Sequence, residues 1–137
     1  MSKKKPTSFI PIACPRIEEN EARAAYDVVK SGWISMGKKV EEFESNACDY
    51  TGAKHAIAMN NGTSTLHACL SALEIGPGDE VIVPSLTYVS SANVILYLGA
   101  KPVLCENDEK TFNLRPQDVE EKITSRTKAF MTVDLKG

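Results

Sequence analysis

The segment Asn60–Thr65, with the sequence NNGTST, places a glycine and three hydroxyl side chains between an apolar stretch and a helical pattern. Gly62 allows backbone conformations that other residues resist. Thr63 or Ser64 can cap the following helix and leave free N–H groups at its positive end. Such a helix start can cradle a phosphate, but a plain strand-to-helix turn with a threonine cap uses the same residues. The segment therefore predicts either an anion site or a simple helix cap.

Tyr88 is the second residue with useful chemistry, four residues beyond Pro84 at the exit of an expected strand. Ligands of parallel sheets bind beyond the carboxyl ends of the strands, so a flat aromatic ring at this position can stack on a planar ligand. Packing against the start of the next helix is the alternative, since aromatic side chains mostly pack. For His67 we also expect a packed side chain, and for Asp79 and Glu80 a solvated pair after a turn.

Several other kinds of site are excluded by the sequence. It has no G-x-x-x-x-G-K-[ST] segment and no G-x-G-x-x-G segment after a strand, which are the common nucleotide and dinucleotide fingerprints. The four cysteines form no Cys-x-x-Cys pair and the two histidines are not at ligand spacing from them, so we expect reduced thiols and no metal.

Composition limits the partners. The net charge is −2 and basic residues cluster only at residues 3–5, which argues against nucleic acid and membrane surfaces. No apolar run approaches the roughly 20 residues that span a bilayer. The basic start is not followed by a long apolar segment, so we expect no secretory signal and a cytoplasmic protein.

Hydrophobic patterning predicts the elements that position these residues. Residues 1–15 look like an arm, and amphipathic helices are expected at 18–31 and 38–51. The following pattern alternates short apolar strands, at 55–59, 80–85, 101–105 and 128–134, with helices at 63–73, 88–99 and 115–123. This order predicts an α/β fold with a mostly parallel sheet and flanking helices. Because the sequence ends just after a strand, we expect the sheet to be truncated.

Four segments in this order and spacing resemble the DegT/DnrJ/EryC1/StrS family, the pyridoxal-phosphate-dependent sugar aminotransferases. They are SGWISMGKKVEEFE, NNGTSTLHACLSALEIGPGDEVIVPSLTYVSSANVILYLGAKPV, DEKTFNL and ITSRTKAFMTVDLKG. The resemblance runs from about Ile10 to Gly137. It implies the large domain of the aspartate-aminotransferase-like, fold type I enzymes over residues 16–137, with the rest of that domain and a small C-terminal domain absent.

The resemblance also implies the roles of individual residues. Gly62, Thr63 and Ser64 match the loop that holds the phosphate of pyridoxal 5'-phosphate, and Tyr88 matches the aromatic residue that stacks on the pyridine ring. The Schiff-base lysine and the carboxylate that pairs with the pyridine nitrogen lie beyond Gly137 in the family. No catalytic residue is therefore expected within this sequence, and residues 1–137 alone should be inactive.

On the substrate side, the resemblance matches Ser31 and Trp33 to a segment near the active site. It implies transfer of an amino group from an amino acid, typically glutamate, to a nucleotide-linked keto-sugar by a homodimer. Two alternatives stay open: a relative that binds a ligand or partner chain without turnover, and a sugar dehydratase of the same fold. In the dehydratases the lysine position is typically a histidine.

Overall fold

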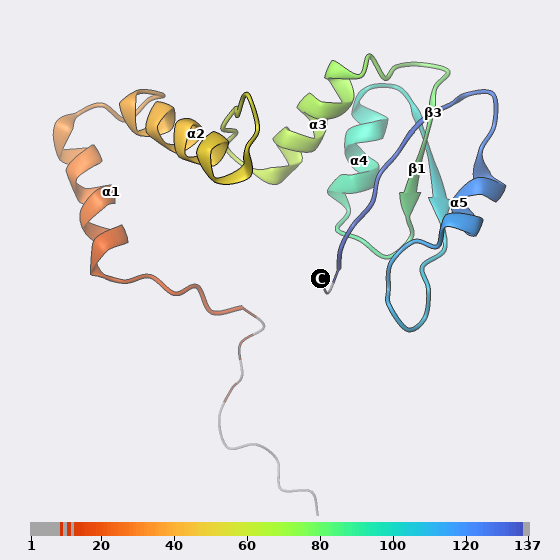
Figure 1. Ribbon diagram of the computed structural model, residues 1–137, viewed down its shortest axis with the longest axis horizontal. Helices are drawn as coiled ribbons and strands as arrows, with labels where there is room; N and C mark the ends of the chain where they lie inside the picture. The colour runs from red at the N-terminus through yellow and green to blue at the C-terminus, as the bar shows by residue number, and fades with distance from the viewer. Residues whose placement is uncertain (1–8, 10, 12, 136–137) are drawn as a thin grey trace, which may run out of the picture. The chain divides into compact units, whose positions relative to one another are not determined.

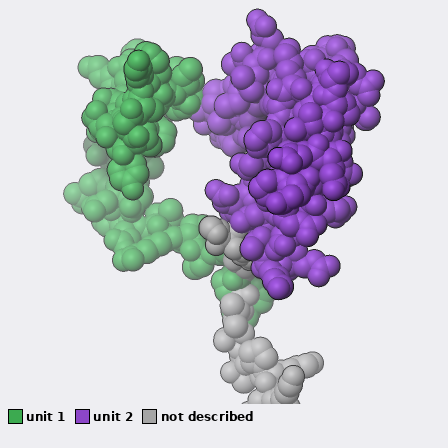
Figure 2. All heavy atoms as spheres, turned by 45° about the vertical axis from the view of Figure 1, so that its right-hand side comes forward, with its two compact units in different colours: residues 1–58 green, residues 59–137 purple. Residues whose placement is uncertain are grey.

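The computed structural model describes Phe9, Pro11 and residues 13–135 of the chain (Figure 1). The expected N-terminal arm, residues 1–15, therefore lies largely outside the described residues. Two compact units make up the chain, residues 1–58 and residues 59–137, coloured separately in Figure 2. Within the described part, no helix is long and apolar enough to cross a membrane.

The first unit contains the helices α1 (Glu19–Ser31) and α2 (Lys38–Thr51), as the patterning predicts. α1 begins with a reciprocal capping box, in which the Glu21 carboxylate accepts the backbone N–H of Glu18 at 2.9 Å. Both helices end at a glycine with left-handed φ, 75° at Gly32 and 74° at Gly52. Neither helix has a buried residue, so their apolar faces lie open within the described chain.

The second unit is a parallel sheet with helices packed on it. Its elements are α3 (Gly62–Ala72), β1 (Glu80–Pro84), α4 (Ser90–Tyr97), β2 (Lys101–Cys105), α5 (Pro116–Lys122) and β3 (Thr127–Phe130). The strand order is β2-β1-β3, and both neighbours run parallel to β1. Because β1 lies between β2 and β3, all five of its residues are buried. The core joins the sheet to α3 and α4 through Leu70, Ile75, Val81, Val83, Val94, Ile95 and Ala100.

The prediction of a strand at residues 55–59 is wrong. No strand is assigned between α2 and α3, and Ile57 has 80% of its surface exposed. A strand requires a neighbour to pair with its backbone groups, and the three strands of this sheet are β1, β2 and β3. An apolar run alone cannot reveal whether such a neighbour exists.

Two other expected elements are shorter in the structure. α4 begins at Ser90 rather than residue 88, and β3 ends at Phe130 rather than residue 134. At β3 the pairing with β1 ends soon after its register shifts, with Met131 still donating to the carbonyl of Ile82 at 2.8 Å. The boundaries therefore depend on pairing geometry, which the apolar run of residues 128–134 does not encode.

Candidate functional site

The start of α3 is capped by Asn61, not by Thr63 or Ser64 as the sequence suggested. The side-chain oxygen of Asn61 accepts the backbone N–H of Ser64 at 2.9 Å, and the backbone carbonyl of Asn61 accepts the N–H of Thr65 at 3.2 Å. Asparagine is among the best N-cap residues because its oxygen reaches the third residue of the helix. The cap therefore uses a residue just before the glycine and leaves both hydroxyl side chains out of capping.

This capping leaves donors without partners at the first turn. Among the described residues, the N–H groups of Gly62 and Thr63 and the hydroxyls of Thr63 and Ser64 have no hydrogen-bond acceptor. They lie at the positive end of the helix dipole, where an anion is stabilised. The local geometry therefore fits a phosphate group.

Gly62 provides open space rather than the unusual backbone conformation that the sequence suggested. Its φ is not in the left-handed region, so the backbone does not require a glycine there. A Cβ built at Gly62 would have no atom within 4 Å, so the chain itself leaves that space empty. Absence of a side chain at this point keeps the helix start open to close approach by a ligand.

Tyr88 lies in the connection between β1 and α4. Its side chain is 75% exposed, so the described residues do not give it the packing role that was the alternative. Its carbonyl accepts the N–H of Ser91 at 3.0 Å and thereby begins the first turn of α4. His67, by contrast, contacts an aromatic ring, with its centroid 6.0 Å from that of Tyr97 in an edge-on arrangement.

Packing places the α3 start and the connection between β1 and α4, which contains Tyr88, on the same side of the second unit. α3 and α4 lie against each other, and both helices begin on the side toward which β1 and β2 point (Figure 1). That side is the carboxyl edge of the parallel sheet, where ligands of open α/β folds bind. The start of α3 and the β1–α4 connection, which carry the four expected cofactor-binding residues, therefore lie toward the carboxyl side of the sheet.

Ser31 and Trp33 lie in the first unit: Ser31 is the last residue of α1, and Trp33 lies in the turn between α1 and α2. The Ser31 hydroxyl donates to the carbonyl of Val28 at 2.7 Å, and the Trp33 indole N–H donates to the carbonyl of Met36 at 3.0 Å. The indole ring also covers Gly37 so closely that a Cβ there would collide with it. Both side chains therefore shape their own turn, and their role toward a substrate stays a prediction.

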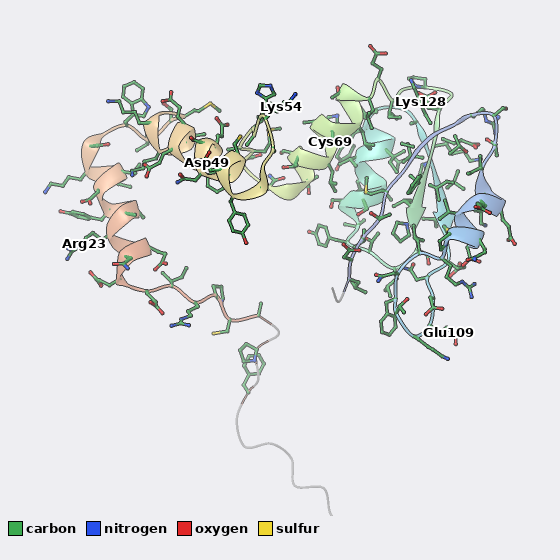
Figure 3. The ribbon with its side chains drawn as sticks, viewed as in Figure 1. Arg23, Asp49, Lys54, Cys69, Glu109 and Lys128 are labelled. Atoms are coloured by element: carbon green, nitrogen blue, oxygen red, sulfur yellow. The ribbon has the colours of Figure 1, made fainter. Side chains whose placement is uncertain are left out.

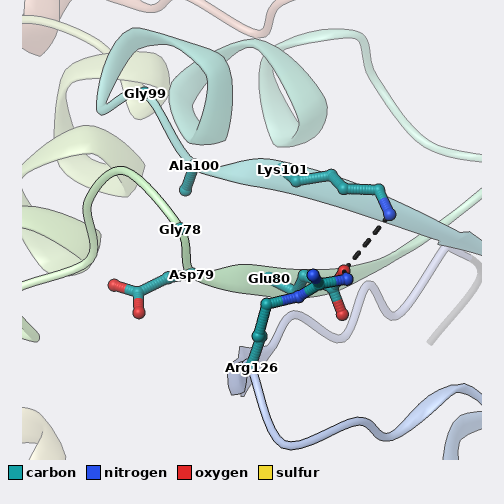
Figure 4. A pocket seen from close by; sticks show the side chains of 7 residues that line it. All are labelled: Gly78, Asp79, Glu80, Gly99, Ala100, Lys101 and Arg126. Carbon is teal, nitrogen blue, oxygen red and sulfur yellow. Dashed lines mark hydrogen bonds and ion pairs between the residues drawn. The ribbon is translucent and has the colours of Figure 1, made fainter.

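At the amino edge of the sheet, a charged cluster surrounds Glu80. Glu80 is buried, so the prediction that it is solvated is wrong. Its carboxylate accepts bonds from Thr124 at 2.6 Å, Arg126 at 2.7 Å and Lys101 at 3.2 Å. Figure 4 shows Glu80 with Arg126 and Lys101. The bond from Thr124, followed by those from Arg126 and Lys101, lowers the pKa of Glu80 to about 2.

The Glu80 cluster consists of Glu80, Lys101, Thr124 and Arg126, and all of these except Thr124 border a hollow of about 320 Å³. Both oxygens of the Glu80 carboxylate accept hydrogen bonds from the chain itself. We therefore assign the cluster a structural role, which is to hold the starts of the strands together. Patterning missed it because its members are far apart in sequence. The available signal was a polar residue at or just before each strand.

The second unit is therefore an open parallel α/β structure, with a helix start that has unpaired donors and an exposed aromatic ring on the carboxyl side of its sheet. These features are typical of proteins that bind a phosphorylated aromatic cofactor. The chain belongs to the DegT/DnrJ/EryC1/StrS aminotransferase family, whose sequence profile matches residues 15–137.

Individual relatives agree with this assignment. GDP-perosamine synthase of Caulobacter vibrioides is 54% identical over 129 residues, which cover 93% of this chain and 35% of that protein. The spore coat polysaccharide biosynthesis protein SpsC of Bacillus subtilis is 43% identical, over 94% of this chain and 33% of that protein. The chain thus spans about a third of the length of these relatives.

Solved structures show the same relationship. The sugar-aminotransferase-like protein Spr1654 of Streptococcus pneumoniae, in its PMP form, superposes with a TM-score of 0.87 and 40% identity, over 92% of this chain and 32% of that one. Its PLP form superposes with a TM-score of 0.83, over 88% of this chain and 31% of that one. The fold is accordingly that of the fold type I, pyridoxal-phosphate-dependent sugar aminotransferases.

Proposed function

We propose that this chain forms the cofactor-phosphate and ring-stacking part of a sugar aminotransferase that uses pyridoxal 5'-phosphate. The observation that carries the proposal is the start of α3, where unpaired donors and an open Gly62 lie on the same side of the sheet as the β1–α4 connection with its exposed Tyr88. Family membership makes pyridoxal phosphate the ligand with the matching phosphate and flat ring.

In this proposal the chain's own residues bind and orient the cofactor. The N–H groups of Gly62 and Thr63, with the hydroxyls of Thr63 and Ser64, hold the phosphate, and the ring of Tyr88 lies against the pyridine ring. When bound, pyridoxal phosphate supplies an electron sink that allows an amino group to change carriers.

We further propose a nucleotide-linked keto-sugar as acceptor and an amino acid, glutamate in the first instance, as donor. Support comes from the relative named as a GDP-perosamine synthase, whose product is a nucleotide-linked amino sugar. A GDP-linked keto-sugar is therefore the first acceptor to assay, with formation of 2-oxoglutarate from glutamate as the readout. Water elimination from the sugar with no 2-oxoglutarate would indicate a dehydratase instead.

The catalytic lysine is proposed to lie beyond Gly137, as the family resemblance implies. Residues 1–137 produced alone should then bind cofactor only weakly and show no transamination. The complete product of the gene should be active, as a cytoplasmic homodimer. Cofactor-dependent turnover by residues 1–137 alone would overturn this assignment of the lysine.

The test of the cofactor site is an equilibrium titration of the complete protein with pyridoxal phosphate. Gly62→Val should weaken binding by about ten- to hundredfold, because it blocks donors that a charged phosphate would use. The matched control is Gly76→Val, since Gly76 also has open space and a φ outside the left-handed region but lies in the turn before β1. Equal affinity of both variants for the cofactor would refute the phosphate site.

A further inference from the structure

The turn that follows β2, residues 106–114, is held together by its own hydrogen bonds. The N–H of Asp108 donates to the carbonyl of Asn113 at 2.9 Å. The Asp108 carboxylate accepts the N–H groups of Lys110 at 3.0 Å and Thr111 at 2.8 Å. Glu109 marks this turn in Figure 3. These bonds make the turn a preformed unit beside the carboxyl edge.

The side chain of Asn107 joins this turn to the connection between β1 and α4. Its Oδ1 accepts the backbone N–H of Leu86 at 2.9 Å and lies 3.4 Å from the hydroxyl of Ser85. Its Nδ2 donates to the carbonyl of Phe112 at 2.6 Å. Both ends of one amide group are therefore bonded, one to each segment.

The bond between Asn107 and Leu86 lies two residues before Tyr88 and therefore bears on the position of Tyr88. The N–H of Ser85 makes the last ladder bond, to the carbonyl of Cys105 at 2.8 Å, and the carbonyl of Tyr88 accepts the first bond of α4. Between these two points, the bond to Asn107 holds the backbone N–H of Leu86, which bonds to neither the strand nor the helix. Two side-chain bonds lie beside it, between Thr87 and Ser91 of α4 at 2.9 Å and from Ser85 to Glu106 at 3.2 Å.

We propose that Asn107 is a positioning residue: its amide fixes the β1–α4 connection and thereby sets where the ring of Tyr88 meets the pyridine ring. In this proposal Asn107 acts only through the backbone of Leu86, two residues before Tyr88. The part of this inference that concerns the ring rests on the proposed function, and the part that concerns the backbone does not.

The first test compares Asn107→Ala with Asp108→Ala in the complete protein. Asp108→Ala removes bonds inside the turn but none to the β1–α4 connection, so it is the matched control. Asn107→Ala should weaken pyridoxal phosphate binding about three- to tenfold, the loss expected for one hydrogen bond, with Asp108→Ala within about twofold of wild type. Inhibition of cofactor binding by inorganic phosphate should be unchanged in both variants, because the α3 start is untouched.

A double-mutant cycle separates positioning from general loosening. In a Tyr88→Ala background, Asn107→Ala should change cofactor affinity by less than about twofold, because the ring it positions is absent. The same loss of affinity in both backgrounds, or an equal loss in Asp108→Ala, would overturn the proposal. Asn107→Val, which fills the space without an amide, should behave as Asn107→Ala and serves if the alanine variant does not fold.

Amide hydrogen exchange tests the backbone part without any cofactor. Residues 85–89 should exchange faster in Asn107→Ala than in wild type, and at the wild-type rate in Asp108→Ala. Faster exchange in a protein that binds no pyridoxal phosphate would support the positioning role and refute the proposed function. Unchanged exchange in Asn107→Ala would overturn the positioning role, whatever the cofactor titration shows.

Discussion

The α3 start and the Glu80 cluster are both polar regions of the second unit, but their polar groups differ in hydrogen bonding. Around Glu80 the carboxylate accepts three donors from other segments and is shielded from solvent. At the α3 start the first N–H groups and two hydroxyls have no acceptor among the described residues, and Gly62 leaves space beside them.

The difference separates holding the fold from binding a ligand. A buried charge is costly unless its own chain satisfies it, so the Glu80 cluster must be complete without a partner. Exposed donors at a helix start cost little, because water can satisfy them until an anion displaces it. Substitutions in the cluster should therefore change stability, and substitutions at the α3 start should change cofactor affinity.

The largest effect expected from this comparison is on affinity, in Thr63→Ala of the complete protein. Losing a hydroxyl donor to a charged phosphate costs about 1.5–3 kcal/mol, roughly a ten- to hundredfold weaker Kd for pyridoxal phosphate. The apo melting temperature should stay near wild type, because Asn61 rather than Thr63 caps the helix.

Thr65→Ala is the control for this variant, since the Thr65 hydroxyl already bonds the carbonyl of Asn61. Titration beside apo melting curves measures both quantities. A lower melting temperature with unchanged affinity in Thr63→Ala would mean that this helix start is structural only.

The next effect is on stability, in Glu80→Ala. Removing the carboxylate deprives Thr124, Arg126 and Lys101 of their shared acceptor and leaves a gap at the strand starts. The apo melting temperature should fall by several degrees, and the cofactor affinity of the folded protein should be unchanged. Glu109→Ala is the control, because it removes an exposed carboxylate. Equal melting temperatures for the two variants would contradict the structural role of the Glu80 cluster.

A smaller effect separates capping from binding within α3 itself. Asn61→Ala should destabilise the protein by about 1 kcal/mol, the usual cost of a lost N-cap, with little change in affinity. Asn61→Asp keeps an acceptor for the Ser64 N–H, so it should restore stability, but its negative charge beside the proposed phosphate should weaken cofactor binding. Urea unfolding and cofactor titration of both variants measure these opposite responses, and tighter binding in Asn61→Asp would contradict them.

The smallest effect is a pH dependence from the pKa of Glu80. That pKa is lowered from 4.5 to about 2 in the folded chain. Its contribution to stability is thus present above about pH 4.5 and lost as the pH falls toward 2. Over this window the free energy of unfolding should fall more steeply in wild type than in Glu80→Gln. Parallel slopes in urea unfolding would show that Glu80 is not the group responsible.

Much of the fold and the family follow from the sequence. The amphipathic periods of α1 and α2, the glycines that end them, and the apolar runs of β1 and β2 are local patterns, so their elements form where expected. The motif order identified the aminotransferase family, and the matching sequence profile confirms it. Pyridoxal phosphate is confirmed as the cofactor at the level of the family, in which a solved relative has PLP and PMP forms.

What the sequence determined by itself was local: residue types, periodicity and the motif around Gly62, because these depend on neighbours along the chain. Only the tertiary structure decided that residues 55–59 form no strand, that Asn61 provides the cap, and that Glu80 is buried. It also brought Asn107 to Leu86, 21 residues away. Strand pairing, burial and such contacts join distant segments, and hydrophobic periodicity carries no information about which distant residues meet.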